Sequence, residues 1–285
     1  GEVGAGPRGR DRQMRGGMRR RSRGSRRAGA GLGGSSFSRG VPAELRLVQV
    51  LLGFALLFGL ATRLVAAAGL VAYLAGLVTN FPELLLASEF VGGFLGILVV
   101  GPGQPSADML IRRVVVTDGT LLSWFRGSPT PSKLLNRVGL TRERAPILIR
   151  VGLGFNFVYL GVSQKWLQPA GGLEVVEQYG LTSVVPVSPE LWVFGAGLVE
   201  FGIGVLFLAG CFTRGAAVAG FVVLTMTLFG LSDDPVLAHI TLFGLTSALM
   251  ITGSGRYSLD DTVVPWLHRR LTVDPADTPP ATADD

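Results

Sequence analysis

Seven long apolar segments constrain the fold of this 285-residue chain more than any other feature. They lie at residues 45–62, 64–80, 84–101, 147–166, 190–211, 215–231 and 236–252. A helix needs about 20 apolar residues to cross a bilayer, and within lipid it satisfies its own backbone hydrogen bonds. With 48% hydrophobic and only 16% charged residues, the chain is too apolar for an ordinary soluble domain. We therefore predict an all-α, polytopic transmembrane helix bundle of about seven spans in a cell membrane.

The boundaries of these segments repeat along the chain. The "ATR" turn at Arg63 aligns with the "FTR" turn at Arg214 at an offset of 151 residues. The stretch "GPGQPSAD" at 101–108 matches "GSGRYSLD" at 253–260 in four of eight positions, at an offset of 152. We interpret the chain as two copies of one helical unit, of which the first lacks its first helix.

Five segments follow from this interpretation. They are a disordered Arg/Gly-rich tail at 1–41, a three-helix partial repeat at 42–106, a connector at 107–146, a four-helix repeat at 147–260 and a C-terminal tail at 261–285. Within the connector, "MLIRRVVVTDG" predicts a short strand and "PSKLLNRVG" predicts a short helix.

Basic residues set the expected orientation. Seven Lys and Arg residues fall in the stretch 102–146 and three near the C-terminus, whereas the stretch 167–189 contains none. Since basic loops face the cytoplasm, the connector and the C-terminus are predicted to be cytoplasmic. The topology residues Arg63, Arg150 and Arg214 lie at inner helix ends, where we expect them to orient helices and cap the final carbonyls.

The first forty residues contain eleven arginines. One interpretation is a basic arm for anionic lipid or nucleic acid. The alternative, which we favour, is a disordered tail or a segment translated from the wrong frame or start in place of the missing helix. The predicted topology puts this tail outside the cell, so no nucleic-acid partner is expected.

Glu200 is the most informative polar residue, since it lies about ten residues into the segment 190–211. An ionised carboxylate at that depth must face the bundle, be paired, or be protonated. Asn156 lies at matching depth and is the expected partner, with Tyr159 nearby. Two roles stay open: proton donation to a ligand, or a hydrogen bond that packs two helices.

Lys165 and His239 lie near the outer ends of their predicted helices. With Glu200 and Asn156 they could line one outward-opening pocket for an anion or a quinone head group. The alternative is interfacial anchoring, supported by the tryptophans 166 and 192. A single cysteine, two histidines and no nucleotide-binding glycine motif leave no metal or nucleotide site to predict.

Residues 145–260 resemble the DoxX/DoxD family of small four-helix membrane proteins, and 42–108 resembles a partial second copy. The features that carry this resemblance are Arg150, Lys165, Glu200, the Thr213–Arg214 turn, His239 and the closing "GSGRYSLD". In the first copy, Gln49 replaces the acid at 200 and Ala87 replaces the histidine at 239.

The resemblance implies a subunit of a quinone-linked membrane oxidoreductase, of the thiosulfate:quinone or quinol-oxidase type. Quinone would be the substrate, with Glu200, His239 and Lys165 in catalytic roles and Asn156 and Tyr159 in substrate binding. A partner redox subunit would hold the cofactor. The alternative is a non-catalytic membrane scaffold or a small-solute permease.

Overall fold

The computed structural model describes residue 1 and residues 43–116, 131–231 and 236–271. The chain divides into two units after Val41, and all the described helices lie in the second unit. Within the described residues every regular element is a helix, which confirms the all-α prediction. Residues 2–42, which include all but the first residue of the predicted N-terminal tail, and residues 272–285 lie outside the described ranges.

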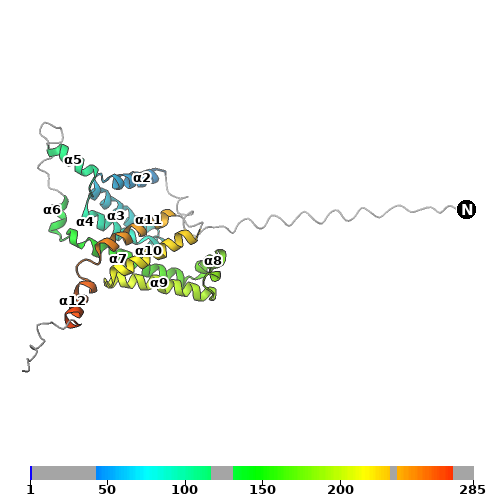
Figure 1. Ribbon diagram of the computed structural model, residues 1–285. Coiled ribbons are helices and arrows are strands. Elements are labelled where there is room, and N and C mark those ends of the chain that lie inside the picture. The colour runs from blue at the N-terminus through cyan, green and yellow to red at the C-terminus, as the bar shows by residue number, and fades with distance from the viewer. Residues whose placement is uncertain (2–42, 117–130, 232–235, 272–285) are drawn as a thin grey trace, which may run out of the picture. The chain divides into compact units, whose positions relative to one another are not determined.

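Among its described residues, the first part of the chain contains four α-helices and one short 3-10 helix (Figure 1). They are α2 (Ala43–Phe58), α3 (Thr62–Thr79), η1 (Glu83–Ala87), α4 (Glu89–Val100) and α5 (Ala107–Val116). The expected single helix at 84–101 is therefore wrong: η1 and a shorter α4 take its place. The connector stretch expected as a strand is the helix α5, because Asp108 lies in its first turn and the Ser106 hydroxyl accepts from the Met109 amide at 3.3 Å.

The second part continues with helices of several kinds. They are α6 (Pro131–Arg137), η3 (Arg142–Arg144), α7 (Ala145–Tyr159), the π-helix η4 (Leu160–Leu167), α8 (Ala170–Gln178), η5 (Leu181–Ser183), α9 (Pro189–Ala209), α10 (Thr213–Gly230), α11 (Val236–Thr252) and α12 (Leu259–Leu271). α6 confirms the short helix predicted for the connector. α12 replaces the beginning of the predicted C-terminal tail, because the Ser258 hydroxyl caps the Asp261 amide at 3.1 Å.

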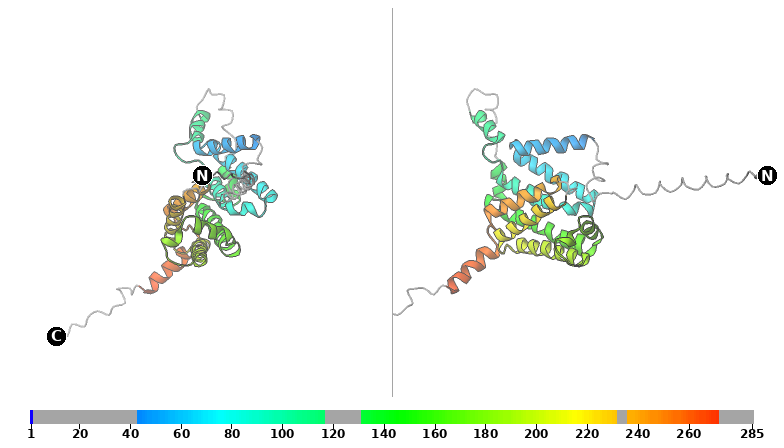
Figure 2. Two further views of the ribbon diagram at one scale, coloured as in Figure 1. Left: turned by 90° about the vertical axis from the view of Figure 1, so that its right-hand side faces the viewer. Right: turned by 45° about the vertical axis from the view of Figure 1, so that its right-hand side comes forward.

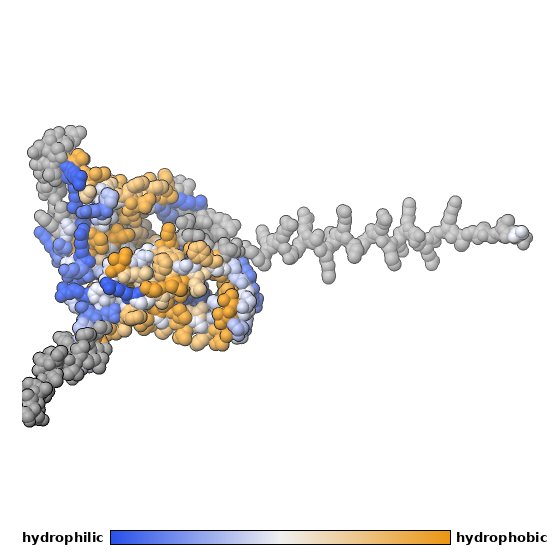
Figure 3. All heavy atoms as spheres, viewed as in Figure 1, coloured by the Kyte–Doolittle hydropathy of each residue, from blue (hydrophilic) through white to orange (hydrophobic). Residues whose placement is uncertain are grey.

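Within the part of the chain that the structure describes, four helical stretches are long and apolar enough to cross a membrane. They are Thr62–Thr79, Arg142–Leu167, Pro189–Ala209 and Thr213–Gly230. α2, α4 and α11 are apolar but shorter. In Figure 3, apolar residues cover most of the visible face, and hydrophilic residues gather at the edge where α5 and α6 lie. This distribution fits a bilayer environment for the bundle.

α7 lies between α4 and α9, and glycines let the three backbones approach closely. A Cβ added at Gly152 would lie 2.6 Å from the Cα of Gly92 on α4. A Cβ added at Gly204 of α9 would lie 2.7 Å from the carbonyl oxygen of Gly154. Membrane helices associate through such close packing, because lipid provides no hydrophobic drive between them.

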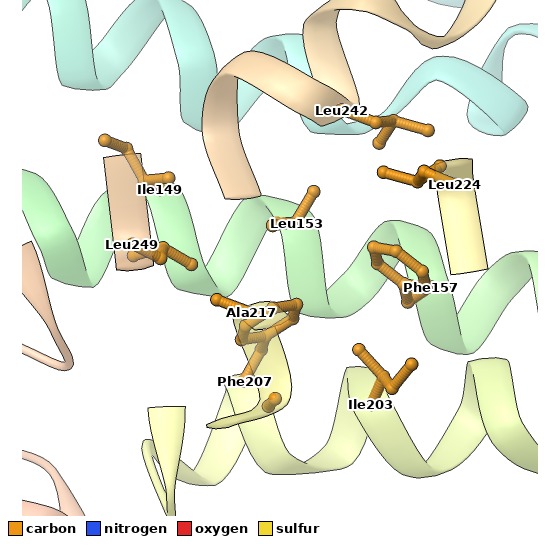
Figure 4. Packing of buried hydrophobic residues seen from close by; sticks show 10 residues of the cluster. Ile149, Leu153, Phe157, Ile203, Phe207, Ala217, Leu224, Leu242 and Leu249 are labelled. Carbon is orange, nitrogen blue, oxygen red and sulfur yellow. The ribbon is translucent and has the colours of Figure 1, made fainter. Parts of the chain in front are cut away.

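The apolar core joins α7 to α9, α10 and α11. Leu153 and Phe157 of α7 meet Phe207 of α9, and Figure 4 shows these side chains together with those of α10 and α11. The rings of Phe157 and Phe207 are 6.0 Å apart. α2, by contrast, packs on α3 at one edge of the bundle, and none of its residues from Arg46 to Phe58 is fully buried (Figure 2).

Two turns of the structure have the same construction. In the α2–α3 turn, the Asp108 carboxylate accepts from the Ala61 amide at 2.6 Å and the Thr62 amide at 3.0 Å. In the α9–α10 turn, the Asp260 carboxylate accepts from the Phe212 amide at 2.6 Å and the Thr213 amide at 2.9 Å. Each carboxylate thus satisfies amides that a helix start leaves unpaired.

Candidate functional site

The most buried polar cluster lies where α4 meets α7. The Asn156 side-chain amide donates to Glu89 Oε2 at 2.8 Å, to the Leu86 carbonyl oxygen at 2.9 Å and to Ser88 Oγ at 3.4 Å. Asn156 is 0% exposed and Glu89 is 2% exposed. Asn156 lies near the middle of the helical stretch Arg142–Leu167, so this cluster lies deep within the bundle.

The break between η1 and α4 explains why an amide is needed there. A helix end leaves carbonyl groups without intrahelical partners, and a buried unsatisfied carbonyl is costly. Asn156 supplies a donor to the Leu86 carbonyl and to the carboxylate at the start of α4. The expected pairing of Asn156 with Glu200 is therefore wrong: within the described residues the amide is bonded to the first part of the chain.

Glu200 lies on α9, on the side that faces the π-helix η4. A Cβ added at Gly161 of η4 would lie 3.4 Å from the Cβ of Glu200. Its Oε2 atom is buried and has no hydrogen-bond partner among the described residues. The charge of Lys165, also on η4, acts on this carboxylate. Glu200 is thus a half-buried acid with one buried carboxylate oxygen, and the charge that acts on it is that of Lys165.

Lys165 lines a hollow of about 530 Å³ between η4, α8 and α9. The residues around it are Lys165, Trp166, Pro169, Leu173, Glu190, Val193 and Phe194. The Trp166 ring stacks on Phe194 at 5.7 Å, and its indole N–H donates to the Phe194 carbonyl oxygen at 3.3 Å. The hollow therefore combines an aromatic wall with one cation and one carboxylate.

The sequence-predicted site residues do not all reach this hollow. Of Lys165, Glu200, His239 and Asn156, only Lys165 is among its lining residues. His239 lies in the first turn of α11 and is half-buried, and α11 packs against α10, α7 and α4. Tyr159 ends α7, with its ring stacked on Phe155 at 6.2 Å.

The three arginines at helix ends contact backbone carbonyls. Arg63 donates to the Leu98 carbonyl oxygen at 3.0 Å and to that of Val99 at 3.3 Å, at the end of α4. Arg214 donates to the Ile251 carbonyl oxygen at 3.5 Å, at the end of α11. The guanidinium of Arg150 is buried and donates to the Tyr257 carbonyl oxygen at 2.5 Å.

Metal ligands are not gathered anywhere in the ranges that the structure describes, where no group of three or more His, Cys, Asp or Glu side chains could hold an ion. The described bundle thus contains the Asn156–Glu89 cluster, a buried carboxylate oxygen of Glu200 and the hollow beside Lys165.

Glu89 and Ser88 accept hydrogen bonds from Asn156, but they are not among the site residues predicted from the sequence. The sequence gives a signal for Glu89, since it is an acid inside an apolar segment, as Glu200 is. The sequence gives no signal that Asn156 pairs with Glu89. In a helix bundle Asn156 could reach several helices, and only the packing of α4 on α7 selects its partner.

Comparison with known proteins gives a match for one stretch of the chain. No curated protein sequence and no solved structure matches the chain. Residues 145–233, which run from the start of α7 to just beyond α10, match the model of the DoxX family.

Proposed function

We propose that this protein is a membrane-embedded subunit of a quinone-linked oxidoreductase, of the thiosulfate:quinone or quinol-oxidase type. The observation that carries the proposal is the hollow beside Lys165, with Trp166 and Phe194 as its aromatic wall. Ligand sites of this class are mostly apolar with a few placed polar groups. A quinone ring would lie against the aromatic wall, and the Lys165 ammonium would donate to one of its carbonyl oxygens.

Protons and electrons have different sources in this proposal. Reduction of a quinone to a quinol takes two electrons and two protons. In the thiosulfate:quinone type a partner redox subunit supplies the electrons through its own cofactor, and in the quinol-oxidase type the partner accepts the two electrons that leave the quinol with its two protons. Glu200 supports the proton side, since one of its carboxylate oxygens is buried and the lysine that lines the hollow acts on it. His239 is proposed to serve proton traffic from α11, and Asn156 and Tyr159 to shape the interior beside it.

Binding of a short-chain quinone to the purified full chain tests this proposal. Decylubiquinone in detergent is expected to quench tryptophan fluorescence saturably, because Trp166 would stack on the ring. Trp166→Phe should remove most of the quenching, and Lys165→Met should weaken binding by about fivefold or more, since a charged hydrogen bond contributes about 1 kcal/mol or more.

Trp192→Phe is the matched control, because Trp192 is on α9 but does not line the hollow. It should leave the quenching curve in place. Quenching that does not saturate, or that responds equally to both tryptophan substitutions, would contradict the quinone site.

A non-catalytic membrane scaffold or small-solute permease is the second candidate. The close glycine contacts of α7 with α4 and α9 favour the scaffold, because they leave little space between these helices. Purification in mild detergent, with identification of co-purifying proteins, a quinone-reduction assay and a solute-flux assay in vesicles, separates the three roles. An oxidoreductase subunit requires quinone for activity, whereas a permease moves solute without it.

We further propose that residues 42–108 and 145–260 are two copies of one unit, the first of them partial. Equivalent contacts at offsets of 151 or 152 residues support this. The Asp108 amide donates to the Gly59 carbonyl oxygen at 2.9 Å, and the Asp260 amide to that of Gly210 at 3.0 Å. Ala61 and Phe212 both adopt left-handed backbone conformations, with φ of 47° and 50°.

A further inference from the structure

We propose that a pocket beside Arg214 binds the headgroup of a membrane phospholipid that carries an ammonium group next to its phosphate, as phosphatidylethanolamine does. The pocket lies at the start of the membrane-spanning stretch Arg142–Leu167, whereas the hollow beside Lys165 lies near the end of that stretch. The inference is therefore independent of quinone binding.

This Arg214 pocket has a volume of about 570 Å³ and lies where the α9–α10 turn meets the loop between α11 and α12. Residues 212–215 and 252–256 line it, together with Glu143, Asp260 and Asp261. Backbone amides, arginines and carboxylates thus surround one space. Which of these groups already has a partner decides what the pocket can bind.

The loop at 253–257 has the backbone shape of an anion-binding concavity. The φ angle is 74° at Gly253, 67° at Gly255 and 58° at Tyr257, and it is negative at the residues between them. Such alternation turns successive amide N–H groups toward one side of the chain. The amides of Ser254, Gly255 and Arg256 donate no hydrogen bond within the described ranges. Three neighbouring donors are therefore available to an anion.

Two side chains add donors beside this loop. Arg214 Nε would lie 3.2 Å from a Cβ added at Gly253, and the guanidinium donates to the Ile251 carbonyl oxygen at 3.5 Å. Thr213 is 0% exposed, and its hydroxyl has no hydrogen-bond partner among the described residues. Arginine and backbone amides suit phosphate oxygens, because both present N–H groups in a fixed geometry. A phosphate group matches this set of donors, which includes a hydroxyl that otherwise stays unpaired.

The carboxylates decide which phosphate compound fits. Asp260 already accepts from two amides of the α9–α10 turn, and Glu143 pairs with Arg256 at 3.3 Å. The Asp261 side chain is exposed and has no hydrogen bond or ion pair with a described residue. It would repel a bare anion and attract an ammonium group next to the phosphate. The ligand is thus a zwitterion, with its phosphate at Arg214 and its ammonium at Asp261.

The surface next to the pocket identifies this ligand as a lipid. Gly215 lines the pocket at the start of α10, which is long and apolar enough to cross a membrane. Val218, Val222, Met226 and Phe229 follow it along α10 and are exposed. Their spacing of three and four residues places them on one face of the helix, in line with Gly215. Acyl chains of a lipid held in the pocket would lie along this apolar stripe.

The similar turn between α2 and α3 lacks these features. At the offset of 152, Pro102 stands where Ser254 does, and proline has no amide N–H to donate. Met109 stands where Asp261 does, so the acid is absent as well. The arginine of that turn, Arg63, therefore serves as a control for Arg214.

Thermal unfolding of the purified full chain, titrated with lipids in detergent, tests the pocket. Dioleoylphosphatidylethanolamine should raise the melting temperature with a saturating dose dependence. Dioleoylphosphatidylcholine has the same chains and phosphate, but its ammonium has no N–H to donate, so half of the shift should need about tenfold more lipid. O-phosphoethanolamine and inorganic phosphate at the same concentrations should have no effect, because they lack acyl chains.

Three substitutions separate the contacts. Asp261→Asn should remove the preference for ethanolamine over choline, and Arg214→Gln should weaken the binding of both lipids by about tenfold. Thr213→Val removes an unpaired buried hydroxyl, so it should not lower the melting temperature without lipid but should reduce the shift that lipid produces. Arg63→Gln is the matched control, because it removes the equivalent contact with the Leu98 carbonyl oxygen. It should leave the lipid-dependent shift unchanged.

Equal half-shift concentrations for the two lipids overturn the proposal, and so does tighter binding of dioleoylphosphatidylglycerol, which carries no ammonium. A comparable shift with inorganic phosphate also overturns it, because the pocket would then bind a soluble anion. A lipid shift that survives both Asp261→Asn and Arg214→Gln would show that the lipid binds elsewhere. None of these outcomes affects the quinone test, which reads Trp166 at the other end of the bundle.

Discussion

Asn156 illustrates what a single polar residue does inside an apolar bundle. Its amide satisfies a carbonyl and a carboxylate of the first part of the chain, and so ties α4 to α7. Glu200, one helix away, keeps a carboxylate oxygen without a hydrogen-bond partner among the described residues. Two acids of similar sequence context therefore have different surroundings: Glu89 accepts a hydrogen bond from Asn156, while Glu200 is the acid that our proposed function uses.

At this scale we predict that Asn156→Ala destabilises the protein through Glu89. The substitution leaves a buried carbonyl and a carboxylate without their donor, which costs about 1–3 kcal/mol. Thermal unfolding in detergent should show a lower midpoint. In double-mutant cycles, Asn156→Ala should be non-additive with Glu89→Gln and additive with Glu200→Gln. Coupling to Glu200 instead would contradict the structure.

At the scale of elements, glycine placement decides which helices touch. The α4–α7 and α7–α9 contacts are made by backbone against backbone, so a methyl group there has no room. Other glycines in the same helices, such as Gly195, face open space. The glycine count of a helix therefore says less about its packing than the position of each glycine.

Two glycine substitutions should have effects of opposite sign. Gly152→Ala places a Cβ against the backbone of Gly92, and we expect it to destabilise by about 1–3 kcal/mol through overpacking. Gly195→Ala meets nothing and should be neutral or stabilise by up to about 1 kcal/mol, because alanine is the better helix former. Chemical or thermal unfolding of the two variants side by side is the measurement, and equal effects would argue against the α4–α7 contact.

At the scale of the whole molecule, charge predicts how the bundle lies in the membrane. The connector contains seven Lys and Arg residues and the C-terminal region three, whereas the stretch 167–189 contains none. In the structure, that stretch includes α8 and η5, at the opposite end of α7 from Arg142 and Arg144. The two chain regions thus lie at opposite ends of one membrane-spanning helix.

Single-cysteine labelling tests this orientation. In a Cys211→Ser background, Gly180→Cys should react with a membrane-impermeant maleimide in intact cells, because the 167–189 connection is predicted to face outward. Thr141→Cys should react only after the cells are permeabilised. The reverse pattern would invert the predicted topology and would place the hollow beside Lys165 on the cytoplasmic side.

The sequence alone determined the helical class, most helix positions and the ends of α9, because apolar length and turn residues such as Ser188, Pro189 and Gly210 act locally. It also marked Glu200, Lys165 and Asn156 as polar residues in apolar surroundings. It could not assign their partners, since hydrogen bonds between residues 67 or more positions apart depend on how helices pack.

Tertiary structure decided the rest. Because α4 packs on α7, the Asn156 amide donates to Glu89. The expected helix at 84–101 is divided into η1 and α4. His239 does not lie among the residues that line the hollow. Apolar periodicity specifies that a helix is buried in lipid or protein, but only close backbone contact specifies its neighbour.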